Sequence, residues 1–310
     1  MNTSRRQALS GYLYALGATA IWSGNFIVAR GLSESVPPVS LAFWRWVVAV
    51  LVFLPFAVKP LIAERQQLLQ NIRYLSVTSF FGVTVFNTLI YIAGHTTSAL
   101  NLSLIAITFP MFIILLSRML YKEVITGAKI FGIALVSGGV VLLITKGNIS
   151  VLHTISFAVG DLWMLAASVI FAIYSIMIKH KPQNLSIWAF QLCPFSLGLL
   201  FLLPFFMWES LTVPPVTYDT TTIFSILYVG VFASLTAFIL WHKAIISIGP
   251  VKSGLIYYTL PLFSGLLAHL LLNESIGMVH LLSALLIIAG ICTANWVSEK
   301  SPPGTAKNTI

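Results

Sequence analysis

Long apolar runs separated by short polar gaps dominate the hydrophobic pattern of this chain. A helix needs about 20 residues to cross a hydrocarbon core of about 30 Å. Runs of this length fall at 11–30, 38–58, 73–93, 97–117, 127–146, 157–178, 185–207, 221–242, 250–271 and 277–297. Backbone polar groups have no water partner inside a bilayer, so such runs must be helical. The pattern predicts an all-α integral membrane protein with ten transmembrane helices.

The second half of the chain repeats the first half at a constant offset. Residues 108–139 align without a gap with residues 259–290. The matched pairs include Thr108 with Thr259, Pro110 with Pro261, Glu123 with Glu274 and Gly139 with Gly290. A second match, Gly11 with Gly160, aligns the beginnings of the two halves. Five spans per half is an odd number, so the second half enters the membrane upside down. Inverted repeats are typical of transporters that alternate access around a central cavity.

The repeat also predicts how the chain is divided. A cytoplasmic tail at 1–10 precedes a first five-helix repeat at 11–147, and an external linker at 148–156 follows. The second five-helix repeat then covers 157–298, and a second cytoplasmic tail covers 299–310. The connections between spans are short, which leaves no room for a soluble domain.

Composition and charge place the chain in a membrane. Hydrophobic residues make up 58% and charged residues 8%, whereas soluble domains carry about 25% charged residues. Of the 17 lysines and arginines, only Arg30 and Lys146 fall at span ends opposite the rest, and Arg45 lies within a span. Basic residues favour the cytoplasmic side, so both termini are expected to be cytoplasmic in a bacterial inner membrane. Cys193 and Cys292 belong to no metal-ligand cluster, and neither a metal site nor another cofactor is expected.

Three stretches resemble the drug/metabolite transporter superfamily, specifically its ten-span EamA type. They are ALNLSLIAITFPMFIILLSRMLYKE at 99–123, its echo TLPLFSGLLAHLLLNE at 259–274, and SLAFWRW at 40–46. The resemblance covers roughly residues 11–298. It implies a pseudosymmetric basket in which the first, third, fourth, sixth, eighth and ninth spans enclose a cavity and the fifth and tenth lie outside. Members of the type include bacterial amino-acid and metabolite exporters.

Polar and aromatic residues near mid-span are the candidates for substrate binding. Each is also a candidate for packing between helices, because a buried amide must find a partner in either case. The candidates are Trp22, Asn25, Asn87, Tyr91, Asn101, Trp163, Tyr174, His242, Tyr257 and Tyr258. Pro110 and Pro261 are expected to bend their helices, either as packing kinks or as hinges.

Charged residues inside the spans are few. Arg45 is flanked by Trp44 and Trp46, which suggests an anchor that reaches the outer headgroups. A basic residue at membrane depth is otherwise a functional candidate. The eight acids fall near span ends, in loops or in tails, which disfavours a proton relay or a trap for cationic drugs. His242 lies near the end of its predicted span and is expected to be an interfacial residue if it does not line the cavity.

The sequence thus indicates a secondary transporter for small neutral or zwitterionic metabolites, amino acids above all. Transport of anionic metabolites such as sugar phosphates is an alternative, with Lys243 and Lys252 as contributors, and multidrug efflux is another. An enzyme is not expected, because the chain has no HExxH motif, no GxSxG motif and no pair of intramembrane aspartates. The expected partners are a small-molecule substrate and membrane lipids. No nucleic acid is expected, and the chain is compatible with a monomer.

Overall fold

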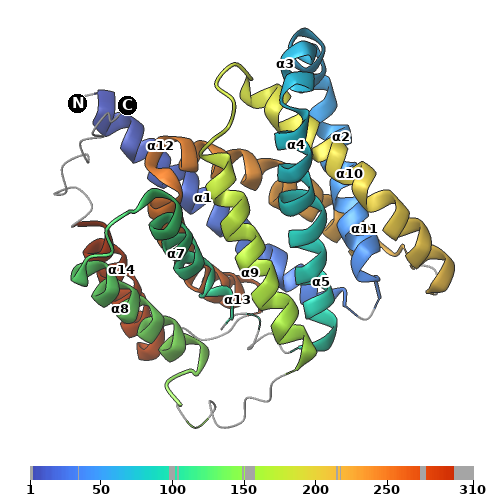
Figure 1. Cartoon of the computed structure of the whole chain (residues 1–310). Helices are drawn as coiled ribbons and strands as arrows, with labels where there is room; N and C mark the ends of the chain where they lie inside the picture. Colours follow the sequence, from blue (N-terminus) through green and yellow to red (C-terminus); the bar gives the residue numbers. More distant parts are fainter. Residues whose placement is uncertain are drawn as a thin grey trace.

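The computed structural model describes residues 3–33, 35–97, 102, 105–148, 150, 158–213, 216, 218–272 and 277–296. Every regular element among these residues is a helix (Figure 1). Within the described part, 7 helices are long and apolar enough to cross a membrane. Together with α1 and the shorter apolar helices they give about ten. The chain is an all-helical, multi-pass membrane protein, as the apolar pattern predicts.

The helices follow the predicted spans with a few shifts in their boundaries. The first half contains α1 (Thr3–Gly31), α2 (Pro38–Ala63), α3 (Arg65–Gln70), α4 (Ile72–Ser79), the π-helix η1 (Phe80–Val85), α5 (Phe86–Thr96), α7 (Phe109–Tyr121) and α8 (Gly127–Ile144). The second half contains α9 (Val159–Ile178), α10 (Ile187–Thr212), α11 (Thr220–Tyr228), the π-helix η3 (Val229–Thr236), α12 (Ala237–Tyr257), α13 (Leu260–Leu272) and α14 (Met278–Trp296).

The third and eighth spans each contain a π-helix at a matching place. The third span is α4, η1 and α5 in succession, and the eighth is α11, η3 and the first part of α12. The offset that aligns the two prolines also carries the end of η1, Val85, onto the end of η3, Thr236. The duplication therefore extends to an irregularity of the backbone. π-Helices are rare and frequently occur at functional sites.

Helix α12 combines parts of two predicted spans, the eighth and the ninth. Gly249 interrupts it with a φ of 81°, a conformation that glycine adopts at little steric cost. Pro250 follows at once and begins the second part, where its missing N–H is no loss. The connection between these two spans is thus shorter than the hydrophobic pattern predicts.

Helices α2 and α10 run antiparallel and cap each other. Glu209, in the last turn of α10, accepts hydrogen bonds from the backbone N–H groups of Val39 (3.1 Å) and Ser40 (2.6 Å) at the start of α2. Glu64, just beyond the end of α2, accepts one from the N–H of Ser186 before α10 (2.8 Å). Each carboxylate satisfies N–H groups that a helix start leaves without intrahelical acceptors. The two acids thus mark opposite ends of the α2–α10 pair.

We predict that Glu209→Ala lowers the free energy of unfolding by about 1–2 kcal/mol, the usual effect of losing a helix N-cap. The reason is that buried N–H groups at the start of α2 lose their acceptor. Thermal unfolding of the protein in detergent measures the effect. Glu123→Ala is the matched control. The Glu123 side chain is 36% exposed, and its carboxylate lies 3.9 Å from the ammonium of Lys179. Such an exposed ion pair contributes little to the free energy of unfolding. Equal losses in the two variants would contradict the capping role.

Pro110 and Pro261 each lie near the beginning of a helix, so the interruption at each proline is more complete than the bend expected within one continuous helix. Pro110 is the second residue of α7, and Pro261 is the second residue of α13. Turn residues precede each helix, at 107–108 and at 258–259. Proline suits the first turn of a helix, where the N–H it lacks would have no intrahelical partner. A hinge role for these two breaks stays a prediction.

Helices α8 and α14, the fifth and tenth spans, pack mainly against each other at one edge of the bundle (Figure 1). They cross closely at two glycines. A Cβ atom added to Gly290 would lie 2.5 Å from the carbonyl oxygen of Gly132, and one added to Gly132 would lie 2.6 Å from that of Gly290. Small residues at such crossings let helix backbones approach in a membrane. The repeat matches Gly290 to Gly139, which also packs against α14, since a Cβ added to Gly139 would lie 3.0 Å from the carbonyl oxygen of Ser283.

Candidate functional site

A fully buried arginine organises a polar network between the two halves. Arg45 of α2 donates from Nε to Ser234 Oγ of η3 (2.6 Å). One terminal nitrogen donates to Tyr91 Oη (2.6 Å) and Asn87 Oδ1 (2.8 Å) of α5, and at 3.4 Å to Asn25 Oδ1 of α1. We call these five residues the Arg45 network. It joins three helices of the first half to a π-helix of the second.

The position of Arg45 corrects the interpretation of this residue as an outer-surface anchor. Its side chain is 0% exposed, so the guanidinium does not reach the headgroups. It lies 5.3 Å from the ring centre of Trp46 and 5.6 Å from that of Tyr91. The flanking tryptophans suggested an interface, but the hydrogen-bond acceptors on α1, α5 and η3 hold the side chain inside. Arg45 and Ser234 were not among the predicted site residues, and their signal in the sequence was a lone basic residue within a span.

A second polar cluster occupies the corresponding place in the other half. Tyr174 Oη of α9 forms a short hydrogen bond with His242 Nε2 of α12, and Trp241 Nε1 donates to Ser175 Oγ (3.1 Å). We call these four residues the His242 cluster. His242 is 2% exposed, so the expectation of an interfacial histidine is wrong. The reason is that α12 continues to Gly249, two turns beyond the predicted end of the span.

The two clusters contain matching polar contacts. In the first half, Tyr91 Oη donates to Asn25 Oδ1 (3.1 Å). The offsets of the repeat carry Tyr91 onto His242 and Asn25 onto Tyr174, and these two residues are also hydrogen-bonded. The duplication thus extends to side-chain chemistry in the interior. It connects the first span to the third in one half and the sixth to the eighth in the other.

The residues matched between α2 and α10 lie at different depths. Arg45 lies about two turns inside the end of α2 that Glu209 caps. The capped serines Ser40 and Ser186 match each other, and five residues after Ser186 the counterpart of Arg45 is Gln191. Gln191 lies about one turn inside the end of α10 that Glu64 caps. Because these caps mark opposite ends of the antiparallel pair, the two polar positions are separated along the bundle. Gln191 is 0% exposed, and neither amide atom has a hydrogen-bond partner within the described part of the chain.

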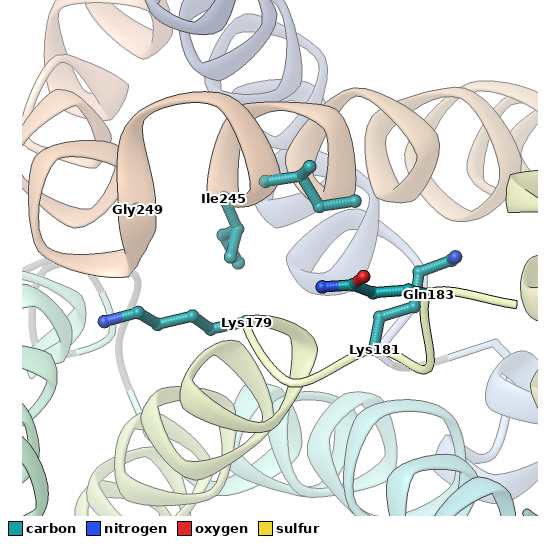
Figure 2. Close-up of a pocket in the computed structure, with 6 residues that line it drawn as sticks. Lys179, Lys181, Gln183, Ile245 and Gly249 are labelled. Atoms are coloured by element: carbon teal, nitrogen blue, oxygen red, sulfur yellow. The ribbon is translucent and has the colours of Figure 1, made fainter.

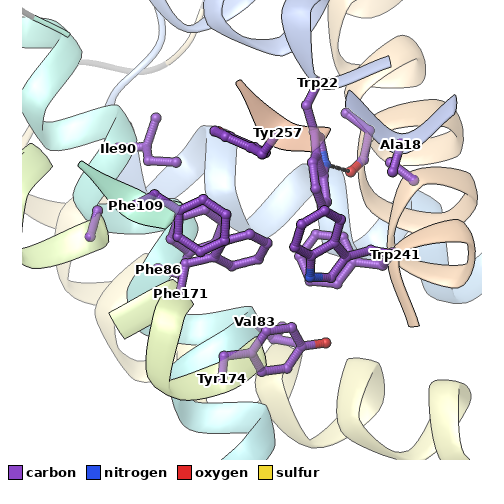
Figure 3. Packing of buried hydrophobic residues seen from close by; sticks show 14 of the residues in the cluster. Ala18, Trp22, Val83, Phe86, Ile90, Phe109, Phe171, Tyr174, Trp241 and Tyr257 are labelled. Carbon is purple, nitrogen blue, oxygen red and sulfur yellow. Dashed lines mark hydrogen bonds between the residues drawn. The ribbon is translucent and has the colours of Figure 1, made fainter. Parts of the chain in front are cut away.

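Aromatic rings pack against one another beside the two clusters (Figure 3). Trp22 of α1 is central: its ring centre lies 5.4 Å from that of Phe171, 5.6 Å from Phe238 and 5.3 Å from Trp241. Its Nε1 donates to the carbonyl of Ala233 (2.9 Å), next to Ser234 of the Arg45 network. The rings come from the first, third, fourth, sixth, eighth and ninth spans. They are those of Trp22, Phe86, Phe109, Phe171, Phe238, Trp241 and Tyr257. We call this set the aromatic layer.

The two helix breaks before Pro110 and Pro261 face each other beside the aromatic layer. A cavity of about 10 Å³ lies between them, lined by Ala106, Ile107, Tyr257, Tyr258, Leu260 and Pro261. That volume is about the space one water molecule needs. Tyr258 is 1% exposed, and its hydroxyl has no partner among the described residues. The centre of the molecule is therefore closely packed here.

A larger cavity of about 500 Å³ opens at one end of the bundle (Figure 2). Lys179, Lys181 and Gln183 line it from the connection between α9 and α10, and Ile245, Ile246 and Gly249 line it from α12. Burial lowers the pKa of Lys181, and the Glu64 carboxylate partly opposes this effect. The ammonium of Lys181 lies 5.4 Å from the ring centre of Phe190, which lies 5.6 Å from the ring of His242. This cavity is thus on the side of the His242 cluster.

The structure brings most of the predicted site residues together, but not all of them. Those buried in or beside the two clusters and the aromatic layer are Trp22, Asn25, Asn87, Tyr91, Tyr174, His242, Tyr257 and Tyr258. Trp163 is 41% exposed near the start of α9, so its placement among the central residues is corrected. The neighbouring Leu162 is 68% exposed as well, and in a helix that is apolar on most faces the sequence does not reveal which face is buried. Asn101 lies outside the described residues.

The sequence matches the model of the EamA-like transporter family twice, over residues 9–145 and 158–296. An "Uncharacterized transporter" of Archaeoglobus fulgidus is 28% identical over 283 residues, covering 87% of this chain and 92% of the relative. A "Probable amino-acid metabolite efflux pump" of Salmonella typhimurium is 26% identical over 287 residues, covering 89% and 92%. A solved crystal structure of a protein matches with a TM-score of 0.75 at 19% identity, covering 94% of this chain and 98% of the other. At that identity the structural match shows the fold alone.

Proposed function

Because the chain belongs to the EamA-like transporter family, we propose that it moves small metabolites, amino acids above all, across the membrane by alternating access. Proteins of this family are transporters and not enzymes. The proposal goes beyond the family in naming amino acids and in assigning the two halves inverted, alternating roles.

The observation that carries the mechanism is the matched pair of polar contacts, Asn25–Tyr91 in the first half and Tyr174–His242 in the second. Transporters built from inverted repeats bind substrate at the repeat interface and expose the site to each side in turn. The antiparallel α2–α10 pair supports an inverted arrangement. In this arrangement, the cavity beside Lys179 and Lys181 is the open side, and the Arg45 network is the closed side.

Amino acids fit this interior because they combine two opposite charges with a side chain of variable polarity. The aromatic layer offers apolar area and faces for an ammonium group, and a cation–π contact contributes about 0.5–2 kcal/mol depending on desolvation. The name of the Salmonella relative points in the same direction. Anionic metabolites such as sugar phosphates are the second candidate, because two lysines line the open cavity.

Counterflow in proteoliposomes tests the proposal. Vesicles loaded with an unlabelled amino acid should accumulate the same labelled amino acid transiently, and protein-free vesicles should not. A panel of amino acids, sugar phosphates and cationic dyes compares the candidate substrate classes in one assay. Counterflow with sugar phosphates alone would replace the first candidate by the second, and counterflow with dyes alone would overturn both.

We also propose that the protein lies in the bacterial inner membrane with both termini in the cytoplasm, because basic residues gather at one set of span ends. Reporters fused after Arg65 and after His180 should both report the cytoplasm. A reporter fused after Val216 should report the outside. A cytoplasmic signal after Val216 would contradict the inverted arrangement of the second half.

A further inference from the structure

We propose that Arg45 binds the carboxylate of the transported substrate through the terminal nitrogen that the protein leaves unpaired, an assignment that rests on the proposed transport function. Four polar partners engage Nε and one terminal nitrogen of Arg45. The second terminal nitrogen has no hydrogen-bond partner among the described residues, although the side chain is 0% exposed. Two N–H groups of a cation are therefore buried and unused.

The charge of Arg45 is not neutralised by any acid that the structure describes. Those acids are engaged at helix ends: Glu64 with Ser186, Glu123 with Lys179, Asp161 with Ala158, Glu209 with Ser40 and Asp219 with Thr222. The groups around Arg45 are two amides and two hydroxyls, which carry dipoles but no net charge. A buried charge without a partner is strongly unfavourable. An anion that arrives from outside the protein is thus expected at this position.

A role in helix packing alone does not explain why this position carries a charge. The matching residue of α10 is Gln191, which is neutral and equally buried. Packing between α2 and α10 is therefore compatible with an uncharged polar side chain at the matching position of α10. The first half therefore carries a buried positive charge at a position where the second half carries none. A ligand with a single negative charge would neutralise it.

Net charge selects a carboxylate among anions. The two N–H groups on the unpaired terminal nitrogen diverge within the guanidinium plane, so the contact available is a charge-assisted hydrogen bond from one of them to a carboxylate oxygen. One guanidinium neutralises one negative charge, and no second cation belongs to the Arg45 network as the described residues define it. A phosphate dianion would keep an excess charge in the apolar interior. The apolar part of the substrate would then lie against the aromatic layer, because Trp22 bonds to Ala233 beside Ser234.

Access to Arg45 requires the protein to open on this side. The residue that binds Nε, Ser234, lies in η3, and Asn87 donates to the carbonyl of Gly82 in η1 (3.3 Å). Both π-helices therefore contact the network directly. A shift of either π-helix would therefore move a residue that holds Arg45, whereas the Lys179 side is already open.

Competition between matched analogues tests the proposal. In counterflow of labelled leucine, unlabelled leucine should compete at least tenfold better than leucinamide or 3-methylbutylamine, which lack the carboxylate. Arg45→Gln should raise the half-saturating leucine concentration more than tenfold. It should also make leucinamide and leucine compete about equally, so that the ratio of their half-inhibiting concentrations is close to one. Arg45→Lys keeps the charge and should recover part of that ratio. Equal competition by leucinamide in the parent protein, or an unchanged ratio in Arg45→Gln, would overturn the assignment.

A second measurement on the unmodified protein avoids dependence on the folding of Arg45 variants. Leucine and 4-methylpentanoate should raise the unfolding temperature in detergent, and leucinamide and 4-methylpentanamide should not. If no amino acid gives counterflow, the proposed substrate class is wrong, and this comparison still decides the role of Arg45. Stabilisation by the free carboxylate alone supports the site, and equal effects of acid and amide overturn it.

Discussion

Replacing Gly290 by leucine is expected to lower the unfolding temperature by about 6 °C or more and to reduce the yield of folded protein. A Cβ at this position would lie 2.5 Å from the carbonyl oxygen of Gly132 and 2.8 Å from the backbone nitrogen of Val136. Backbone atoms of α8 cannot rotate away as a side chain can, so the helices must separate. Overpacking costs typically about 1–3 kcal/mol and occasionally more. We expect a cost in the upper part of that range here, and each kcal/mol lowers the unfolding temperature by about 2–4 °C.

The expected loss is large because α8 and α14 have little other support. They contact mainly each other, so separating them removes most of the packing that holds either helix. Gly138→Leu on α8 is the matched control, since a Cβ there meets nothing within 4 Å. Thermal unfolding and size-exclusion elution in detergent compare the two variants with the parent. If the two variants lose the same stability, the cause is a general effect of the added side chain, such as altered lipid contact, and the crossing is not the determinant.

The sequence carries most of the information about spans, because bilayer thickness fixes the length of every apolar run. It also carries the duplication, since Pro110 and Pro261 begin corresponding helices after corresponding turns. The breaks themselves were not predicted. Residues 97–117 form one predominantly apolar run without a charged residue, and hydropathy does not distinguish a continuous helix from two helices joined by a turn. The π-helices escaped prediction for the same reason, because side-chain polarity is unaffected by one extra backbone residue per turn.

The candidate site was predictable in composition but only partly in geometry. Asn25, Asn87 and Tyr91 were chosen because polar groups inside a membrane need partners, and they do share one partner. That partner, Arg45, was assigned to the surface because Trp44 and Trp46 suggested an interface. Linear sequence gives the depth of a residue along its helix, but which side chains meet across the bundle depends on the rotation of four helices. A tertiary contact such as Arg45–Ser234, between residues far apart in the chain, has no local signal.

Changing Asn87 to aspartate is expected to stabilise the protein and to weaken substrate binding at the same time. Asn87 Oδ1 accepts a hydrogen bond from Arg45 at 2.8 Å, so an aspartate would place a carboxylate against the guanidinium. Arg45 is already desolvated, and the new ion pair replaces a charge–dipole contact by a charge–charge contact. The variant loses the donation from Nδ2 to the Gly82 carbonyl, and the carboxylate oxygen that replaces Nδ2 is repelled by that carbonyl, which offsets part of the gain. We expect an increase of about 1 kcal/mol in the free energy of unfolding, or about 2–4 °C.

The same change should raise the half-saturating concentration of a carboxylate substrate at least tenfold, about 1.4 kcal/mol of binding free energy. The internal aspartate would neutralise Arg45 and repel a second carboxylate. Asn87→Leu is the matched control, because it removes the acceptor without adding a charge. It should lower stability by about 1.5–3 kcal/mol, the value of a hydrogen bond to a charged group, while the guanidinium stays available to substrate. Stability and affinity should therefore change in opposite directions in Asn87→Asp. A network that serves packing alone would leave substrate affinity unchanged in the stabilised variant, and that outcome would remove Arg45 from the substrate site.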